Sequence, residues 1–129
     1  MDREQAMIFL DTNAVIYLYS GHRDFSARVT KLINESDCFI SPLVKLELQY
    51  LHEIGRGKKK AQTIIDALSH EIGLGIHDYS LEAIISAATE MSWTRDPFDR
   101  LITAHAKATN CHLVTSDKII QKHYTKAVW

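Results

Sequence analysis

Five short apolar runs recur along the chain, and longer segments with helical periodicity separate them. The runs are Met7–Leu10, Cys38–Ile40, Leu74–His77, His112–Thr115 and Ala127–Trp129. Short strands that alternate with helices are typical of a parallel sheet in an α/β protein. The pattern therefore predicts an α/β fold with five strands.

The segments between these runs predict helices whose ends carry capping residues. Ser41 followed by Pro42 marks the start of one helix, and Gly55 marks its end. The other predicted helices are two between Asn13 and Glu35, one from about Lys58 to Ile72, one from Ser80 to Met91 and one from near Asp96 to Asn110. No linker or biased segment interrupts the pattern, so we expect a single domain over residues 1–129.

The composition narrows the class of protein. With 46% hydrophobic and 24% charged residues, the chain has the composition of a globular protein and not of a disordered one. Its formal net charge of -1 excludes a strongly basic nucleic-acid-binding domain, so any such binding requires local clustering of cations. The apolar stretch Ala6–Leu10 is too short for a membrane span or a signal peptide, and we expect a cytoplasmic protein without a membrane partner. Cys38 and Cys111 lie beside strand-like runs, which favours reduced thiols in the core.

Two aspartates follow predicted strands. Asp11 comes directly after the first strand, and Asp117 comes two residues after Thr115 at the end of the fourth. Ligands of open α/β sheets bind outside the carboxyl ends of the strands, where the strand order reverses. Either aspartate alone is an ordinary turn or capping residue, but their matching placement favours a functional site.

Three further acids belong to predicted helices. Glu47 shares a helix face with Leu43, Val44, Leu51 and Ile54, so it either pairs with a basic neighbour or reaches a polar site. Asp96 is best interpreted as a helix cap, whereas Asp99 lies at the margin of the apolar face. Carboxylates that converge from four segments repel one another unless a cation lies among them. Oxygen ligands favour a hard ion such as Mg²⁺ or Mn²⁺.

Motifs along the whole chain are similar in order and spacing to one family. They are Phe9-Leu-Asp11-Thr-Asn13, Glu47 in the helix after the second strand, Arg95-Asp-Pro-Phe-Asp99-Arg100-Leu-Ile-Thr-Ala-His-Ala and Leu113-Val-Thr-Ser-Asp117. Together they resemble the PIN domain of VapC-type toxin ribonucleases. The resemblance implies a three-layer α/β/α fold around a central, mostly parallel five-stranded sheet.

The resemblance also assigns roles to residues. Asp11, Glu47, Asp99 and Asp117 match the acidic quartet of the family, Asp96 matches its accessory acid, and Thr12, Asn13, Thr115 and Ser116 match supporting polar positions. His105 stands where many relatives carry glutamine. The implied activity is that of an Mg²⁺- or Mn²⁺-dependent endoribonuclease, in which an activated water cleaves RNA to leave a 5′-phosphate and a 3′-hydroxyl. The implied partners are the RNA substrate, a cognate antitoxin protein and a second copy of the chain.

A group of basic residues is a candidate for binding RNA. Without the four acids of the quartet, the formal charge of -1 becomes +3. The cations nearest in sequence to the site helix are Lys45, Arg56, Lys58, Lys59 and Lys60. These residues either contact the phosphate backbone of RNA or form a solvated helix start.

Two other function classes remain open at this level. A phosphotransferase or phosphatase that forms an aspartyl-phosphate also places an aspartate after the first strand and uses Mg²⁺. A catalytically inert PIN module would bind RNA or protein without cleaving it. The sequence favours neither a zinc protease nor a serine hydrolase, because His52-Glu53 and His70-Glu71 lack the second histidine and no serine has a Gly-x-Ser-x-Gly setting.

Overall fold

A parallel five-stranded sheet forms the centre of the protein in a computed structural model that describes residues 6–22 and 24–129. The sheet has the strand order β3-β2-β1-β4-β5, and every neighbouring pair is parallel. The strands are β1 (Met7–Leu10), β2 (Asp37–Ile40), β3 (Gly75–Ile76), β4 (His112–Val114) and β5 (Ala127–Val128). The predicted α/β fold is confirmed, and the sheet is wholly parallel.

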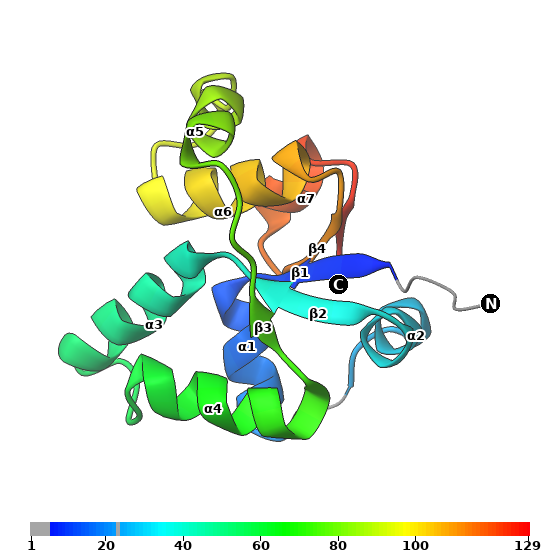
Figure 1. Ribbon diagram of the computed structural model, residues 1–129, viewed down its shortest axis with the longest axis vertical. Coiled ribbons are helices and arrows are strands. Elements are labelled where there is room, and N and C mark those ends of the chain that lie inside the picture. Colours follow the sequence, from blue (N-terminus) through cyan, green and yellow to red (C-terminus); the bar gives the residue numbers. More distant parts are fainter. Residues whose placement is uncertain (1–5, 23) are drawn as a thin grey trace.

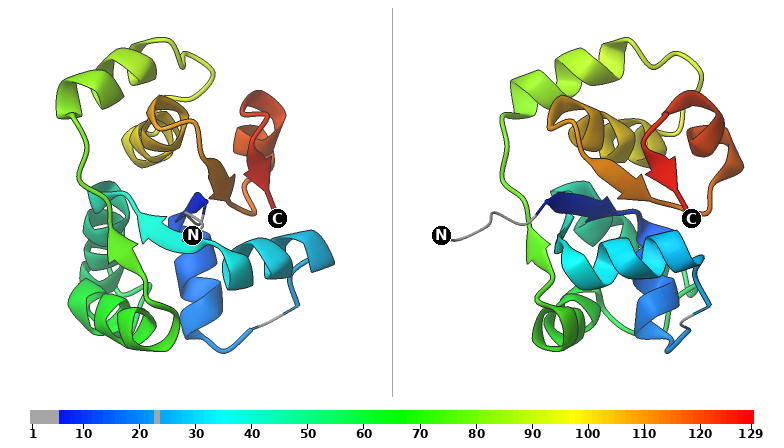
Figure 2. Two further views of the ribbon diagram at one scale, coloured as in Figure 1. Left: turned by 45° about the vertical axis from the view of Figure 1, so that its right-hand side comes forward. Right: turned by 90° about the vertical axis from the view of Figure 1, so that its right-hand side faces the viewer.

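Helices cover both faces of this sheet, so the fold has three layers (Figures 1 and 2). One face carries α1 (Thr12–Tyr19), α2 (Ala27–Glu35), α3 (Pro42–Glu53) and α4 (Ala61–Ile72). The opposite face carries α5 (Leu81–Thr89), α6 (Pro97–Ala108) and α7 (Lys118–His123). Because crossovers between parallel strands are right-handed, the helices change face where the chain turns back across the sheet after β3.

The apolar runs form strands because both of their faces are buried. Ile8 and Leu10 are fully buried, and Phe9 between them is 1% exposed. Strands covered on both faces consist of continuous apolar residues and show no alternation. Cys38 and Cys111 are buried free thiols, as predicted.

Capping residues fix where the helices begin. The side chains of Ser26, Ser41, Ser80, Asp96 and Asp117 each accept a hydrogen bond from a backbone N–H in the first turn of the following helix. At the other end of α4, Gly73 adopts a left-handed conformation with φ of 72°, which suits a residue without a Cβ atom. The predicted starts at Ser41, Ser80 and Asp96 are therefore confirmed.

Three local expectations were wrong. Helix α7 was not predicted, because six residues are too few to show helical periodicity. Helix α4 begins at Ala61 and not near Lys58, since residues 56–60 form an irregular loop with bends. Ile54 lies beyond the last turn of α3 and is 46% exposed, so the buried face of that helix is shorter than its pattern suggested.

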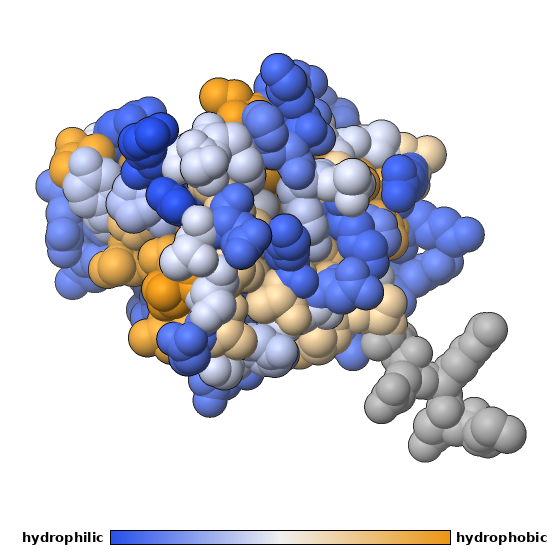
Figure 3. Space-filling view, turned by 90° about the horizontal axis from the view of Figure 1, so that it is seen from above, coloured by the Kyte–Doolittle hydropathy of each residue, from blue (hydrophilic) through white to orange (hydrophobic). Residues whose placement is uncertain are grey.

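Within residues 6–22 and 24–129, no helix is both long and apolar enough to cross a bilayer. The face seen in Figure 3 is mostly hydrophilic, with apolar residues gathered in separate patches. Exposed apolar side chains of the described chain include Leu81 and Ile85 on α5 and Ile119 on α7.

The strand order determines where a site can form. Strand β1 pairs with β2 on one side and with β4 on the other, so the chain runs from β1 to β2 and β3 on one side and returns from β3 to β4 on the other. At such a switch point the loops after the two central strands separate and leave a crevice. Asp11 follows β1 and Thr115 follows β4, which places both at this point.

Candidate active site

Asp11 lies at the buried bottom of the site. Its side chain is 3% exposed, and its N–H donates to the carbonyl oxygen of Val114 at 2.9 Å. Its Oδ1 accepts from the N–H of Thr12 at 2.7 Å, and its Oδ2 accepts from the Thr115 hydroxyl at 2.7 Å. Burial raises the pKa of Asp11, and these two hydrogen bonds oppose that rise. The carboxylate is thus held rigidly by two segments that are about a hundred residues apart in the sequence.

Thr115 connects Asp11 to the second aspartate. The Thr115 oxygen accepts from the N–H of Asp117 at 3.1 Å while its hydroxyl donates to Asp11. The loop is also tied to α1, because the Asn13 side-chain oxygen accepts from the N–H of Ser116 at 3.3 Å. The supporting residues predicted from sequence therefore join the carboxyl ends of β1 and β4.

Asp117 and Asp96 each cap a helix at the edge of the site. Oδ1 of Asp117 accepts from the N–H groups of Ile119 and Ile120, at 2.8 and 3.0 Å. Oδ1 of Asp96 accepts from the N–H of Asp99 at 3.0 Å, which is the capping role predicted for it. In both carboxylates Oδ1 caps a helix, and Oδ2 is the oxygen that remains for other contacts.

Asp99 and Glu47 complete a group of acids that act on one another. Burial and the negative charges of Asp96, Asp11, Asp117 and Glu47 raise the pKa of Asp99 to about 7. Burial and the charges of Asp11 and Asp96 raise the pKa of Glu47. We refer to Asp11, Glu47, Asp96, Asp99 and Asp117 as the acid cluster. No cation of the described chain is among the groups that act on Asp11, Glu47 or Asp99.

The donor set of the acid cluster fits a hard divalent cation. Its members offer carboxylate oxygens, which are the ligands that Mg²⁺ and Mn²⁺ prefer. In their present positions, no three His, Cys, Asp or Glu side chains of the described residues are close enough together to hold one metal ion. Mg²⁺ commonly takes only one or two protein carboxylates and completes its coordination with water and substrate phosphate.

The raised pKa of Asp99 predicts a pH-dependent stability in chelator. The folded protein holds the proton of Asp99 up to about pH 7, whereas the ordinary pKa of an aspartate side chain is 3.8, so ionisation of Asp99 is more costly in the folded state. The free energy of unfolding should therefore fall as the pH rises from about 4 to about 7. Urea unfolding at pH 5 and pH 7.5 should show a smaller fall in Asp99→Asn than in the wild type, and equal falls would contradict the assignment.

His105 lies on α6 but is not among the groups that act on the acid cluster. It is fully buried against Phe9, and its Nε2 lies 3.0 Å from Nδ1 of His77. Burial lowers the pKa of His105 to about 4, so the ring is neutral at physiological pH. Its position indicates a core side chain.

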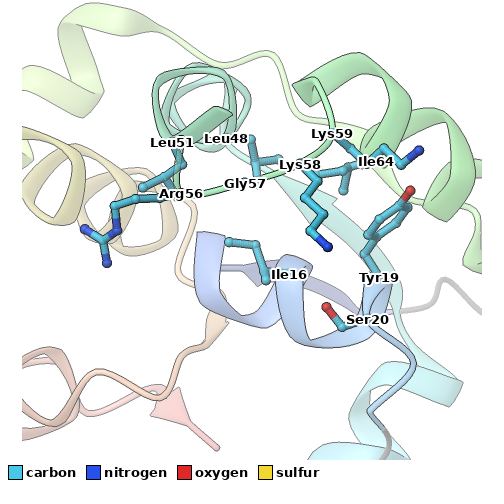
Figure 4. Close-up of a pocket in the computed structure, with 10 residues that line it drawn as sticks. All are labelled: Ile16, Tyr19, Ser20, Leu48, Leu51, Arg56, Gly57, Lys58, Lys59 and Ile64. Carbon is cyan, nitrogen blue, oxygen red and sulfur yellow. The ribbon is translucent and has the colours of Figure 1, made fainter. Parts of the chain in front are cut away.

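Beside the site, α1, α3 and α4 enclose a groove that was not predicted from sequence. Its volume is about 340 Å³, and apolar side chains of all three helices line it, among them Ile16, Leu48 and Ile64. Arg56, Lys58 and Lys59, from the α3–α4 loop, stand along its rim (Figure 4). Of the five candidate RNA-binding residues, these three line the groove, whereas Lys45 and Lys60 are exposed outside it.

The sequence model of the PIN domain matches residues 8–126. The chain belongs to the PIN domain family. The match begins in β1 and extends to the residue before β5, so it includes every member of the acid cluster. Membership supports the prediction of a nuclease.

Solved structures show the same PIN fold. VapBC2 from Rickettsia felis, bound to a DNA fragment from its promoter, is 26% identical with a TM-score of 0.69 and covers 95% of this chain and 97% of that chain. A toxin-antitoxin complex from Klebsiella pneumoniae and VapBC-1 from nontypeable Haemophilus influenzae are each 22% identical, with TM-scores of 0.65, and cover 95% of this chain and 96% of theirs. A comparison with curated protein sequences gave no match. The predicted resemblance to PIN domains of the VapC type is confirmed.

Proposed function

We propose that this PIN domain is a toxin-like endoribonuclease whose acid cluster hydrolyses RNA phosphodiesters with Mg²⁺ or Mn²⁺. The supporting observation is that Asp99 is acted on by four other carboxylates and by no cation of the described chain. Such a cluster is electrostatically costly by itself and becomes favourable when a divalent cation joins it.

The members of the acid cluster have different proposed roles, which follow from their burial and hydrogen bonds. Asp11 is fixed by Thr12 and Thr115, so it provides a preorganised anchor for the cation. Asp99 and Glu47 have raised pKa values and accept a proton more readily than ordinary carboxylates, which suits a group that orients an attacking water. Asp117 and Asp96 each keep one carboxylate oxygen that does not cap a helix and that can serve as a ligand or hydrogen-bond acceptor.

A bound divalent cation supplies two effects in such a site: it lowers the pKa of a coordinated water and neutralises charge on the phosphate. Asp11, Asp99, Asp117 and Glu47 are the residues that we propose to hold it, some of them through coordinated water, because no three of the described carboxylates are close enough together to bind one ion directly. The acids of this chain provide negative charge, and the substrate phosphate provides the oxygens that the carboxylates do not.

A cleavage assay with labelled RNA distinguishes the ribonuclease from the phosphotransferase and from the inert binding module. Incubation of the purified protein with Mg²⁺ should shorten the RNA and leave Asp11 unmodified. A phosphorylated Asp11 trapped after incubation with a phosphate donor would favour a phosphotransferase. Binding of RNA without cleavage, with Mg²⁺ and with Mn²⁺, would favour an inert binding module.

The basic rim of the groove supports RNA binding from one side of the site. Lys59→Ala should weaken RNA binding by the same factor for different sequences and reduce the slope of log K against log salt by about 1, because one phosphate contact is lost. Fluorescence anisotropy in chelator at several salt concentrations measures both quantities. Lys31→Ala, which removes an exposed lysine of α2, is the matched control, and an equal effect in both variants would contradict a local role for Lys59.

We also propose an antitoxin partner and a homodimer. The VapBC complexes among the structural neighbours support the proposal of an antitoxin partner. The groove, with an apolar floor and a cationic rim, fits an amphipathic segment with acidic residues.

Exposed apolar residues support the proposal of a homodimer. Leu46 and Tyr50 on α3 and Leu81 and Ile85 on α5 are 40% to 64% exposed. Light scattering of the wild type and of Leu46→Glu tests the dimer, which should dissociate in the variant.

A further inference from the structure

A second pocket lies on the opposite face of the sheet, between α6, the α5–α6 loop and the turn after α7. Its volume is about 270 Å³, and its lining includes Trp93, Lys107, Asn110, His123 and Lys126. The lining residues include two lysines and, within the described chain, no Asp or Glu. In a protein with a net charge of -1, this is a local positive surface.

One wall of this pocket is an aromatic platform. The Trp93 and His123 rings are stacked, with centroids 4.9 Å apart and an interplanar angle of 5°. Trp93 is held in place because it packs against both hydrophobic clusters of the core. His123 is exposed, and the next residue, Tyr124, is buried and donates from its hydroxyl to the Cys111 carbonyl oxygen at 2.6 Å. The platform is therefore a fixed aromatic surface that is open to a planar ligand.

The lysines supply the second element of a nucleotide site. Lys126 donates from its Nζ to the Asn110 carbonyl oxygen at 3.1 Å, which holds the ammonium group beside the pocket. An ammonium group has three N–H donors, so two remain for a phosphate. Lys107, on the last turns of α6, is exposed at the same pocket.

Two short segments of the chain join the aromatic platform of this pocket to members of the acid cluster. Helix α7 begins after Asp117 and ends at His123, and six helical residues span about 9 Å. Trp93 precedes Asp96 by three residues, which span at most about 10 Å. The platform therefore lies close enough to the acid cluster for one strand of RNA to reach both.

We propose that this pocket is a nucleotide subsite for single-stranded RNA, in which a base stacks on the Trp93–His123 platform and Lys107 and Lys126 contact the phosphates. The inference rests on the proposed ribonuclease function. Sites for single-stranded nucleic acid combine aromatic side chains that stack bases with cations that follow the backbone, and this pocket has both. Because stacking tolerates any base, the subsite should add affinity with little sequence preference.

Tryptophan fluorescence provides a direct probe, since the chain has only two tryptophans. Trp129→Phe leaves Trp93 as the only tryptophan, which is excited selectively at wavelengths that tyrosine does not absorb, and keeps an aromatic ring against Tyr17 and Phe25. A short single-stranded oligoribonucleotide of mixed sequence, added in chelator, should quench Trp93 in a saturable manner. Absence of quenching at RNA concentrations that saturate anisotropy would overturn the proposal.

Variants at His123 test the stacking itself. His123→Ala should weaken oligoribonucleotide binding about fivefold or more, because stacking of one base contributes about 1–3 kcal/mol, whereas His123→Phe should retain wild-type affinity. Lys126→Gln should weaken binding and reduce its salt dependence. The matched control is His22→Ala, which removes a histidine stacked on Tyr17 with centroids 4.7 Å apart. Melting temperatures measured for each variant separate loss of binding from loss of fold.

The outcome for the subsite can be separated from the outcome for the nuclease. Saturable quenching of Trp93 with loss of affinity in His123→Ala supports the subsite even if Mg²⁺ and Mn²⁺ produce no cleavage, a result that would count against the nuclease alone. Cleavage with an unchanged KM in His123→Ala would overturn the subsite and leave the nuclease intact. Equal losses in His123→Phe and His123→Ala would also overturn it, because the Phe ring preserves stacking.

Discussion

Asp99→Asn should reduce the rate of RNA cleavage by about 10²–10³-fold, the cost typical of removing one preorganised electrostatic group from an active site. Asp99 is the residue on which the charges of all other members of the acid cluster act. Its replacement by a neutral amide of the same shape removes a proposed cation ligand and a proton acceptor together. The measurement is a single-turnover cleavage time course at saturating protein concentration, which separates the chemical step from RNA binding.

Two other asparagine substitutions serve as controls for the loss of cleavage rate in Asp99→Asn. Asp96→Asn should reduce the rate less than Asp99→Asn does, because asparagine also caps α6 and one oxygen of Asp96 is already engaged there. Asp37→Asn should leave the rate unchanged, since Asp37 is exposed at the start of β2, at the end of the sheet opposite the site. A wild-type rate in Asp99→Asn would remove this residue from the mechanism.

Mg²⁺ should raise the melting temperature of the wild type by several degrees, and Asp11→Asn should lose most of this response. A ligand that binds only the folded state stabilises it by about 2.7 kcal/mol at a concentration 100 times Kd, which corresponds to about 5–15 °C for a domain near this size. In chelator, Asp11→Asn should melt at a higher temperature than the wild type, because it removes a buried carboxylate whose pKa burial and neighbouring charges raise.

Asp37→Asn is the control for these melting-temperature measurements. Asp37→Asn removes an exposed carboxylate, so it should keep the wild-type response to Mg²⁺. An undiminished Mg²⁺ response in Asp11→Asn would exclude Asp11 as a ligand. A lower melting temperature of Asp11→Asn in chelator would show that its hydrogen bonds with Thr12 and Thr115 outweigh the relief of charge repulsion.

Much of the fold could be predicted because local signals agreed with one another. Strands such as Met7–Leu10 are short, continuously apolar and buried on both faces, and caps such as Ser41 and Asp96 mark helix starts directly in the sequence. Helix α7 escaped prediction because its only strong signal is its cap, Asp117, which had been assigned to the site. One aspartate serves both purposes: Oδ1 caps the helix and Oδ2 remains available.

The candidate site was harder to predict because its properties arise from tertiary contacts. The sequence indicated acids at the ends of β1 and β4, but the hydrogen bond from Thr115 to Asp11 depends on the two strands being neighbours. The mutual effect of the charges on Asp99 likewise requires four segments to converge. Neither the groove nor the Trp93–His123 platform has a sequence signature, since residues far apart in the chain form each of them. An exposed apolar residue that lines the groove, such as Ile16 on α1, cannot be distinguished from a core residue by its helical spacing in the sequence.

The central claim is that the acid cluster cleaves RNA by directing water to the phosphorus with the help of a divalent cation. The most direct test is a cleavage time course on RNA with Mg²⁺, with Mn²⁺ and with chelator, followed by analysis of the new RNA ends. We expect cleavage only with the cations, and products that carry a 5′-phosphate and a 3′-hydroxyl. Cleavage that persists in chelator, or products that end in a 2′,3′-cyclic phosphate, would show that the 2′-hydroxyl of the RNA attacks and would contradict the account.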